Sequence, residues 1–375
     1  MNSLIRLSKS VVGKEEANAL AEVILNDGML GMGQYVQMFE NQLKSFFDGK
    51  KEVCCVNTGT SALHLAVASV VSPGDEVLVQ SLTYLSSFQA ISAAGACPIP
   101  CEILPGSITI DLQDAENRIT EKTKAIMPVH YAGNCGNLDE IYKFAEQHNL
   151  RVIEDAAHAF GTTYKGKKIG TFGDIICFSF DGIKNITSGE GGAIVTSDSD
   201  ILQYVQDARL LGIHKDTDKR YSGLRSWEFD VTKQGYRYHM SNLFGSIGIE
   251  QLKKFSTFKQ SRQKLAKRYD TNLKDLSNLI LFDFNYDNIV PHIYPVRILD
   301  NNRDGLRKFL VDNNVQCGVH YYPNHLLSFY AKSGASLPIT EKVYSELLTL
   351  PLHPNLKMEQ QDRVLNLIKK YLKVG

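Results

Sequence analysis

The segment Val152-Ile153-Glu154-Asp155-Ala156-Ala157-His158 is an apolar run that ends on an acidic residue, and it belongs to the pattern that decides the expected fold. Between about residues 53 and 195, short β-rich runs alternate with helical segments such as Ser61–Val70 and Leu138–His148. The expected strands are Val53–Val56, Glu76–Val79, Ala125–Val129, Val152–Glu154, Ile175–Ser179 and Gly192–Thr196. This alternation predicts an α/β domain with a mostly parallel central sheet, whose ligand sites lie at the carboxyl ends of the strands.

The chain outside this region predicts a flanking segment and a second, smaller lobe. Residues 14–27 have helical spacing and end at Gly28. After about residue 255 the pattern changes to that of an α+β lobe. Its expected parts are a charged helix from Ser261 to about Leu273, the segments Ile289–Arg297 and Cys317–Tyr322, and helices Asp304–Asn313 and Met358–Leu372. We therefore expect an N-terminal segment and large α/β domain over 1–255 and a smaller C-terminal α+β domain over 256–375.

Composition excludes several classes of function. The 375 residues contain 41 Lys plus Arg and 41 Asp plus Glu, so no global basic excess favours nucleic acid as a partner. No window approaches the roughly 20 apolar residues that a membrane-spanning helix needs. The seven cysteines are scattered and lack the paired spacing of a zinc site. We expect reduced thiols, no metal, no membrane association and a cytoplasmic protein.

Two residues at expected strand ends carry reactive groups. Asp155 follows an apolar strand, where its carboxylate can pair with a protonated pyridine nitrogen; a helix cap is the simpler interpretation of this residue alone. Lys184 follows the strand Ile175–Ser179 in a loop with glycine, although most lysines are merely exposed. An enclosed lysine amine loses its charge more easily and becomes a nucleophile for an aldehyde.

Two further segments favour a phosphate site near these residues. Asn57-Thr58-Gly59-Thr60-Ser61 lies between a strand and a helix, where hydroxyls and free amides can hold an anion, although such residues usually only cap the helix. Ser179, five residues before Lys184, offers another hydroxyl. The glycines at 189, 191 and 192 predict a tight return that packs the lysine loop in place.

The order of these motifs resembles one enzyme family over nearly the whole chain. The runs NTGTSALHLA (57–66), VIEDAAHAFGT (152–162) and SFDGIKNITSGEGGAIVT (179–196) are similar to the DegT/DnrJ/EryC1/StrS family of pyridoxal-phosphate (PLP) nucleotide-sugar aminotransferases. Residues 13–40, 235–255, 320–325 and 348–356 resemble its N-terminal segment, subunit-contact motif and C-terminal lobe. The resemblance implies the fold-type I architecture of PLP-dependent transferases.

The resemblance also implies a role for each matching residue. Lys184 would be the catalytic Schiff-base lysine and Asp155 the partner of the pyridine nitrogen, with His158 near the ring hydroxyl. Tyr84 would stack on the ring, because a flat side chain suits a pyridine face. Phosphate binding would fall to Gly59, Thr60 and Ser179, and the sugar pocket to His320, Tyr321 and His325.

One position departs from the family pattern. Where the family often has GYNYRM, this chain has Arg237 in place of an Asn that reaches the phosphate from the neighbouring subunit. Arginine also donates to phosphate, but contact with the nucleotide-sugar or a structural ion pair is equally compatible with this position. If the phosphate role holds, the active site is shared across a homodimer.

The implied reaction moves an amino group from L-glutamate to a nucleotide-linked keto-deoxysugar for surface glycan biosynthesis. The pattern Leu7-Ser8-Lys9-Ser10 followed by GMLGMG (28–33) resembles relatives that aminate position 4, so a 4-keto-6-deoxyhexose is expected and a 3-keto sugar is the alternative. Lys184 argues against a sugar dehydratase, whose relatives are expected to lack the lysine. A non-catalytic PLP-binding regulatory or scaffold protein is the alternative of another class. A dinucleotide-binding dehydrogenase is disfavoured because no glycine fingerprint follows the first strand.

Overall fold

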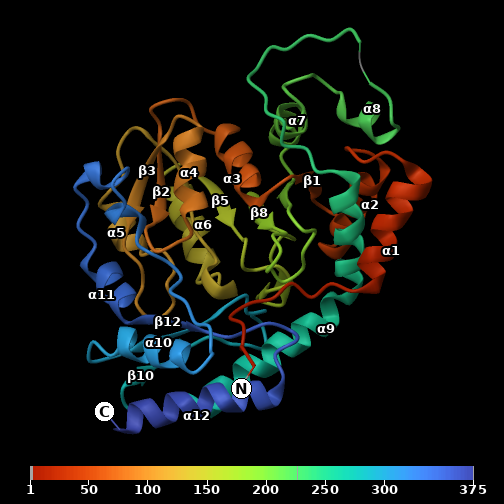
Figure 1. The fold of residues 1–375 in the computed structure, drawn as a ribbon. Coiled ribbons are helices and arrows are strands. Elements are labelled where there is room, and N and C mark those ends of the chain that lie inside the picture. Colours follow the sequence, from red (N-terminus) through yellow and green to blue (C-terminus); the bar gives the residue numbers. More distant parts are fainter. Residues whose placement is uncertain (1–2, 226, 375) are drawn as a thin grey trace.

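The computed structural model describes residues 3–225 and 227–374, and its centre is a seven-stranded sheet (Figure 1). In spatial order the strands are β1 (Glu52–Val56), β9 (Gly192–Thr196), β8 (Ile175–Ser179), β5 (Arg151–Asp155), β4 (Thr123–Met127), β2 (Glu76–Gln80) and β3 (Cys97–Cys101). From β8 to β3 every neighbouring pair is parallel, whereas β9 is antiparallel to both β1 and β8. The predicted α/β class and its mostly parallel sheet are confirmed.

The sequence did not predict the strand β3, which contains Pro98 and Pro100. Proline cannot donate to a ladder and is expected only at edges or bulges. β3 lies at the edge of the sheet and pairs with β2 alone, so its free side tolerates missing donors.

Helices cover both faces of this sheet (Figure 1). One buried cluster joins one face to α2, α6 and α9, and another joins the opposite face to α3, α4 and α7. The helices of this part are α1 (Lys14–Glu22), α2 (Gln34–Phe46), α3 (Gly59–Ala68), α4 (Leu85–Ala93), α5 (Leu112–Glu116), α6 (Leu138–Gln147), α7 (Ser199–Ala208), α8 (Thr217–Tyr221) and α9 (Asn242–Leu273). Shorter elements are the π-helical turn η1 (Val23–Asp27), the 3-10 turn η2 (Tyr131–Gly133) and the hairpin β6 (Thr163–Tyr164) and β7 (Lys167–Lys168).

The helix expected to start at Ser261 begins much earlier, at Asn242, and α9 extends over 32 residues. Its first half contains glycine, which disfavours helix in isolation. Tertiary packing explains the difference: a Cβ at Gly245 would lie 2.9 Å from the carbonyl oxygen of Tyr35, so glycine lets α9 and α2 approach closely. The expected domain boundary at residue 255 lies inside this continuous helix, and the division into 1–255 and 256–375 stays a prediction.

The C-terminal part forms a smaller α+β lobe around an antiparallel sheet, β10 (Leu279–Ile280), β11 (Tyr294–Ile298) and β12 (Leu347–Leu350). Its other elements are α10 (Arg303–Asp312), η3 (Asn324–Leu326), η4 (Ala331–Ser333), α11 (Pro338–Glu346) and α12 (Met358–Val374). Near the N-terminus, Ile5 pairs with Val315 and is buried in the cluster of this lobe. The N-terminal segment therefore lies on the same side of the molecule as the C-terminal lobe (Figure 1).

Within the described ranges, no helix is both long and apolar enough to span a bilayer. The same residues contain no group of three or more His, Cys, Asp or Glu side chains placed to hold a metal ion.

Candidate active site

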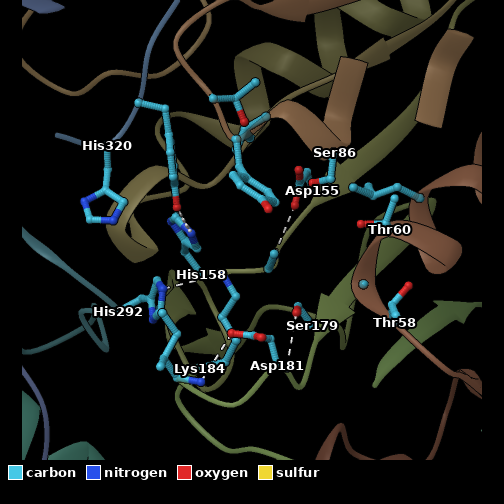
Figure 2. Close-up of a pocket in the computed structure, with 18 of the residues that line it drawn as sticks. Thr58, Thr60, Ser86, Asp155, His158, Ser179, Asp181, Lys184, His292 and His320 are labelled. Atoms are coloured by element: carbon cyan, nitrogen blue, oxygen red, sulfur yellow. Dashed lines mark hydrogen bonds between the residues drawn. The ribbon is translucent and has the colours of Figure 1, made fainter. Parts of the chain in front are cut away.

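A cavity of about 350 Å³ lies where the carboxyl ends of the parallel strands face the C-terminal lobe (Figure 2). One wall comes from the loops after β1, β2, β5 and β8, as expected for ligand sites in parallel sheets. The other comes from His292, His320 and Tyr321 of the C-terminal lobe. Polar residues of the first wall are Thr58, Thr60, Thr83, Tyr84, Ser86, Asp155, His158, Ser179, Asp181, Lys184 and Glu190.

Lys184 reaches this cavity from a turn after β8. Its backbone N–H donates to the carbonyl of Asp181 at 3.0 Å, and Asn185 donates to two backbone carbonyls beneath the turn. Burial lowers the pKa of the Lys184 amine to about 8, with a smaller contribution from the Arg262 cation, while Asp181 and Asp155 act in the opposite direction. Because a neutral amine is the nucleophilic form, the lowered pKa increases the competent fraction of Lys184 near neutral pH.

Asp155 ends β5 and is only 3% exposed. Its carboxylate accepts from the hydroxyl of Ser87 at 2.7 Å and from the backbone N–H of Ala157 at 3.2 Å. Burial raises its pKa, although these donors and Lys184 oppose the change. No ion pair involving Asp155 occurs within the described residues, so a buried carboxylate faces the cavity ready for a cationic ligand group.

His158 follows β5 and has a defined tautomer. The backbone N–H of Ala132 donates to Nδ1 at 3.3 Å, and Nε2 lies 3.0 Å from the hydroxyl of Tyr321. Burial and the nearby Lys184 hold the pKa of His158 well below its ordinary value, so the ring is neutral. With Nδ1 accepting, the proton sits on Nε2 and is donated to the Tyr321 oxygen, which leaves the Tyr321 proton free to be donated elsewhere.

A cradle for an anion lies at the start of α3. Thr58 caps the helix by accepting from the N–H of Ser61, which leaves the first-turn amides of Gly59 and Thr60 for a ligand. Ser179 closes the cradle from the end of β8: a Cβ at Gly59 would lie 2.7 Å from the Cβ of Ser179. Glycine is therefore required at 59 for the two segments to meet.

Two further predicted residues, Tyr84 and His320, line the cavity. Tyr84 lines the cavity, 57% exposed, with its ring centroid 5.4 Å from that of Tyr321. His320 also lines the cavity, and its Nδ1 lies 2.9 Å from the Thr349 hydroxyl. Burial lowers the pKa of His320 to about 4.

His325 is not brought into the cavity, contrary to expectation. It is buried at 2% exposure, its Nδ1 lies 2.7 Å from the Ser81 hydroxyl, and its Nε2 lies 3.2 Å from the Glu341 carboxylate. Both ring nitrogens are thus engaged away from the cavity lining. Arg237 is exposed and forms a bridge with Leu210, so it does not line the cavity of its own chain.

Sequence reasoning missed several residues that contact the site. His292 approaches Lys184, Ser87 donates to Asp155, and Arg262 holds the lysine turn. Ser87 lies in the segment that contains Tyr84, so the helix start after β2 was a usable signal. His292 and Arg262 stand in no local motif and reach the site only through the packing of the C-terminal lobe.

The comparisons with known proteins agree with this geometry. Residues 11–369 match the DegT/DnrJ/EryC1/StrS aminotransferase family, and the chain belongs to that family. It is 33% identical over 383 residues to the spore coat polysaccharide biosynthesis protein SpsC of Bacillus subtilis, covering 99% of this chain and 98% of that protein. It is 34% identical over 389 residues to the GDP-perosamine synthase of Caulobacter vibrioides, covering 99% and 100%.

Solved structures give the same assignment. The Helicobacter pylori aminotransferase PseC, involved in pseudoaminic acid biosynthesis, superimposes with a TM-score of 0.92 at 27% identity over the whole of both chains. The PLP form of Spr1654 from Streptococcus pneumoniae, a protein assigned as a sugar aminotransferase, superimposes with a TM-score of 0.90 at 26% identity, covering 99% of each chain. The chain is an aminotransferase-family enzyme with sugar aminotransferase homologues, and structural homologues carry PLP.

Proposed function

We propose that this chain binds PLP and moves an amino group from L-glutamate to a nucleotide-linked keto-deoxysugar, a 4-keto-6-deoxyhexose in the first instance. The observation that carries the proposal is the meeting of an amine with lowered pKa, Lys184, and a buried carboxylate without an ion-pair partner in the described chain, Asp155, across one cavity. Figure 2 shows the two side chains entering it from different sides.

The residues fit the cofactor at its ring nitrogen and its phosphate. Asp155 suits a protonated ring nitrogen, because a buried carboxylate without a cation is otherwise costly. The amides of Gly59 and Thr60 with the Ser179 hydroxyl suit the phosphate. Bound PLP would supply an electron sink that makes a proton on the amino-bearing carbon acidic.

The protein's own groups then divide the remaining work. Lys184 would hold the cofactor covalently and, once released, take and return the proton at the reacting carbon. His158 and Tyr321 would present a hydroxyl proton to an oxygen in the cavity, and Tyr84 would cover the ring face. His320 and Tyr321 would line the sugar side.

Among the residues that the structure describes, no arginine lines the cavity, although the carboxylates of Asp181 and Glu190 do. A dianionic phosphate beside two carboxylates needs further positive charge. Arg237 of a second copy would supply it, which supports a homodimer with a shared active site. A cytoplasmic location stays part of this proposal, because nucleotide-sugars and L-glutamate would be its substrates.

The sugar assignment rests on relatives and on the N-terminal pattern at residues 7–13 and 28–33. One relative is named a GDP-perosamine synthase and another a spore coat polysaccharide protein, which supports a nucleotide-linked sugar for surface glycan synthesis, O-antigen or lipopolysaccharide included. The 3-keto sugar stays the alternative. A non-catalytic scaffold would not require the lowered pKa of Lys184.

Absorbance of the purified protein before and after L-glutamate tests the proposal. We expect a visible band of lysine-bound PLP that moves to the ultraviolet with glutamate, and no such band in Lys184→Ala. A panel of 4-keto and 3-keto nucleotide-sugars is then added one at a time. The sugar that restores the visible band is the acceptor. Failure to bind added PLP would overturn the catalytic proposal, and bound PLP without a response to glutamate would overturn the donor.

A further inference from the structure

His292 lies against the catalytic lysine from the opposite side of the cavity. Its Nε2 is 3.4 Å from Nζ of Lys184, the contact drawn as the dashed line that starts at the His292 ring in Figure 2. The residue is 4% exposed and its ring centroid is 4.4 Å from that of His158. It stands just before β11, so the C-terminal lobe places it.

The surroundings of the other ring nitrogen of His292, Nδ1, indicate which of the two residues donates the hydrogen bond. Nδ1 is buried and has no hydrogen-bond partner within the described residues. A buried N–H without an acceptor is rarer than a buried acceptor without a donor, which favours the tautomer with the proton on Nε2. In that tautomer the Nε2 proton faces the lysine amine.

Arg262 of α9 fixes both members of the contact. Its guanidinium donates to the carbonyls of His292 at 3.0 Å and Lys184 at 3.4 Å, and to those of Pro291 and Ile183 beside them. The side chain is 2% exposed, and no carboxylate pairs with it in the described part of the chain. One buried cation thus ties the lysine turn to the His292 segment through four backbone oxygens.

We propose that His292 is a positioning residue for Lys184: its Nε2–H donates to the lone pair of the neutral amine, and Arg262 fixes the two backbones that set this distance. The proposal rests on the proposed function, because it concerns the interval in which the Lys184 amine is free. A donor to the lone pair favours the neutral form and aims the amine at the cavity.

Other charged groups act on the same amine from each surrounding element. Asp181 on its own turn and Asp155 at the end of β5 favour the ammonium form, and the Glu190 carboxyl also lines the cavity. Arg262 is cationic and favours the neutral amine, whereas burial holds the pKa values of His158, His292 and His320 low and keeps these rings uncharged. His292 is therefore a neutral donor among groups of both charges. Its removal is expected to raise the pKa of the Lys184 amine.

The test measures the pH at which Lys184 reacts in the full-length, cofactor-free protein, using trace acetic anhydride and mass spectrometry of the Lys184 peptide. His292→Phe removes the donor at similar volume, and we expect the reaction midpoint to rise by about 0.5–1 pH unit. His292→Gln keeps an amide donor near Nε2 and is expected to stay within about 0.3 unit of wild type. His64→Phe is the matched control, since His64 is also buried (5%) but contacts Tyr238.

An unchanged or lowered midpoint in His292→Phe would overturn the proposal, because it would mean that the ring accepts from the ammonium or does not contact the amine. If that variant fails to fold by circular dichroism, His292→Gln decides: a rise of 0.5 unit or more contradicts a donor role and a retained midpoint supports it. The labelling needs neither cofactor nor sugar. A failed response to glutamate in the wild type with the expected midpoints would therefore reject the proposed function and leave the contact intact.

Discussion

The two walls of the cavity come from different kinds of structure. The large-domain wall consists of residues at the ends of parallel strands, among them Asp155, Ser179 and Lys184. The C-terminal wall consists of His292, His320 and Tyr321, which stand in irregular segments between short strands. The large-domain wall carries the groups that suit the cofactor, and the C-terminal wall carries groups that orient those side chains. We therefore expect substitutions on the large-domain wall to reduce activity more than substitutions on the C-terminal wall.

The largest expected effect is on the large-domain wall. In the proposed mechanism Lys184→Ala removes the group that would move the proton. With PLP added to both proteins, we expect the glutamate-driven change in absorbance of the variant to be slower than that of the wild type by about 10³-fold or more. Stopped-flow absorbance measures this rate. Lys51→Ala is the control, because Lys51 is also buried but donates to the carbonyl of Gly173 outside the cavity; an equal loss in both variants would contradict the assignment.

Asp155→Asn tests the proposed pairing of Asp155 with the ring nitrogen of PLP. The substitution keeps the shape but removes the negative charge, so we expect a loss of about 10²–10³-fold in kcat with the fold retained. Steady-state kinetics and cofactor titration measure it. Ser87→Ala, which removes one donor to this carboxylate, should cost only about tenfold, and a reversed order would contradict the charge argument.

The difference between the walls also explains what could be predicted from the sequence. Asp155, Lys184 and the segment 57–61 could be predicted as neighbours because each lies at or just after the end of an expected strand. The alternation of strands and helices places the carboxyl ends of parallel strands at one edge of the sheet. The sugar-pocket role of His325 stays a prediction. Its motif, 320–325, resembles a pocket segment as a whole, but contacts with Ser81 and Glu341 engage its ring, and it does not line the cavity. His292 and the early start of α9 depend on packing between distant segments, for which a local pattern carries no signal.

The pH dependence of cofactor capture tests the electrostatics of the first wall. The pKa of Lys184 is lowered to about 8, so its neutral fraction increases with pH below that value and is nearly complete above it. The rate at which the cofactor-free protein forms the visible band with PLP should rise about tenfold per pH unit below 8 and level off above. A rate that still rises from pH 9 to 10 would show an unperturbed lysine.

A smaller effect is expected on the C-terminal wall at Tyr321. Tyr321→Phe removes the hydroxyl that His158 contacts, and we expect about a five- to tenfold loss in kcat/KM for the keto-sugar half-reaction. The control is Tyr322→Phe, because Tyr322 is 48% exposed and packs against Tyr344. Equal effects of the two variants would indicate that the Tyr321 hydroxyl has no part in the site.

The smallest expected effect on activity is at His325, which separates residues of the C-terminal wall from residues that only support it. His325→Asn loses the contact with the exposed Glu341 carboxylate and disturbs the one with the buried Ser81 hydroxyl, so we expect the free energy of unfolding to fall by about 1 kcal/mol. KM for the keto sugar should stay within about twofold, because the ring does not line the cavity. Thermal unfolding and steady-state kinetics measure the two effects, and a large rise in KM at unchanged stability would place His325 in the sugar pocket after all.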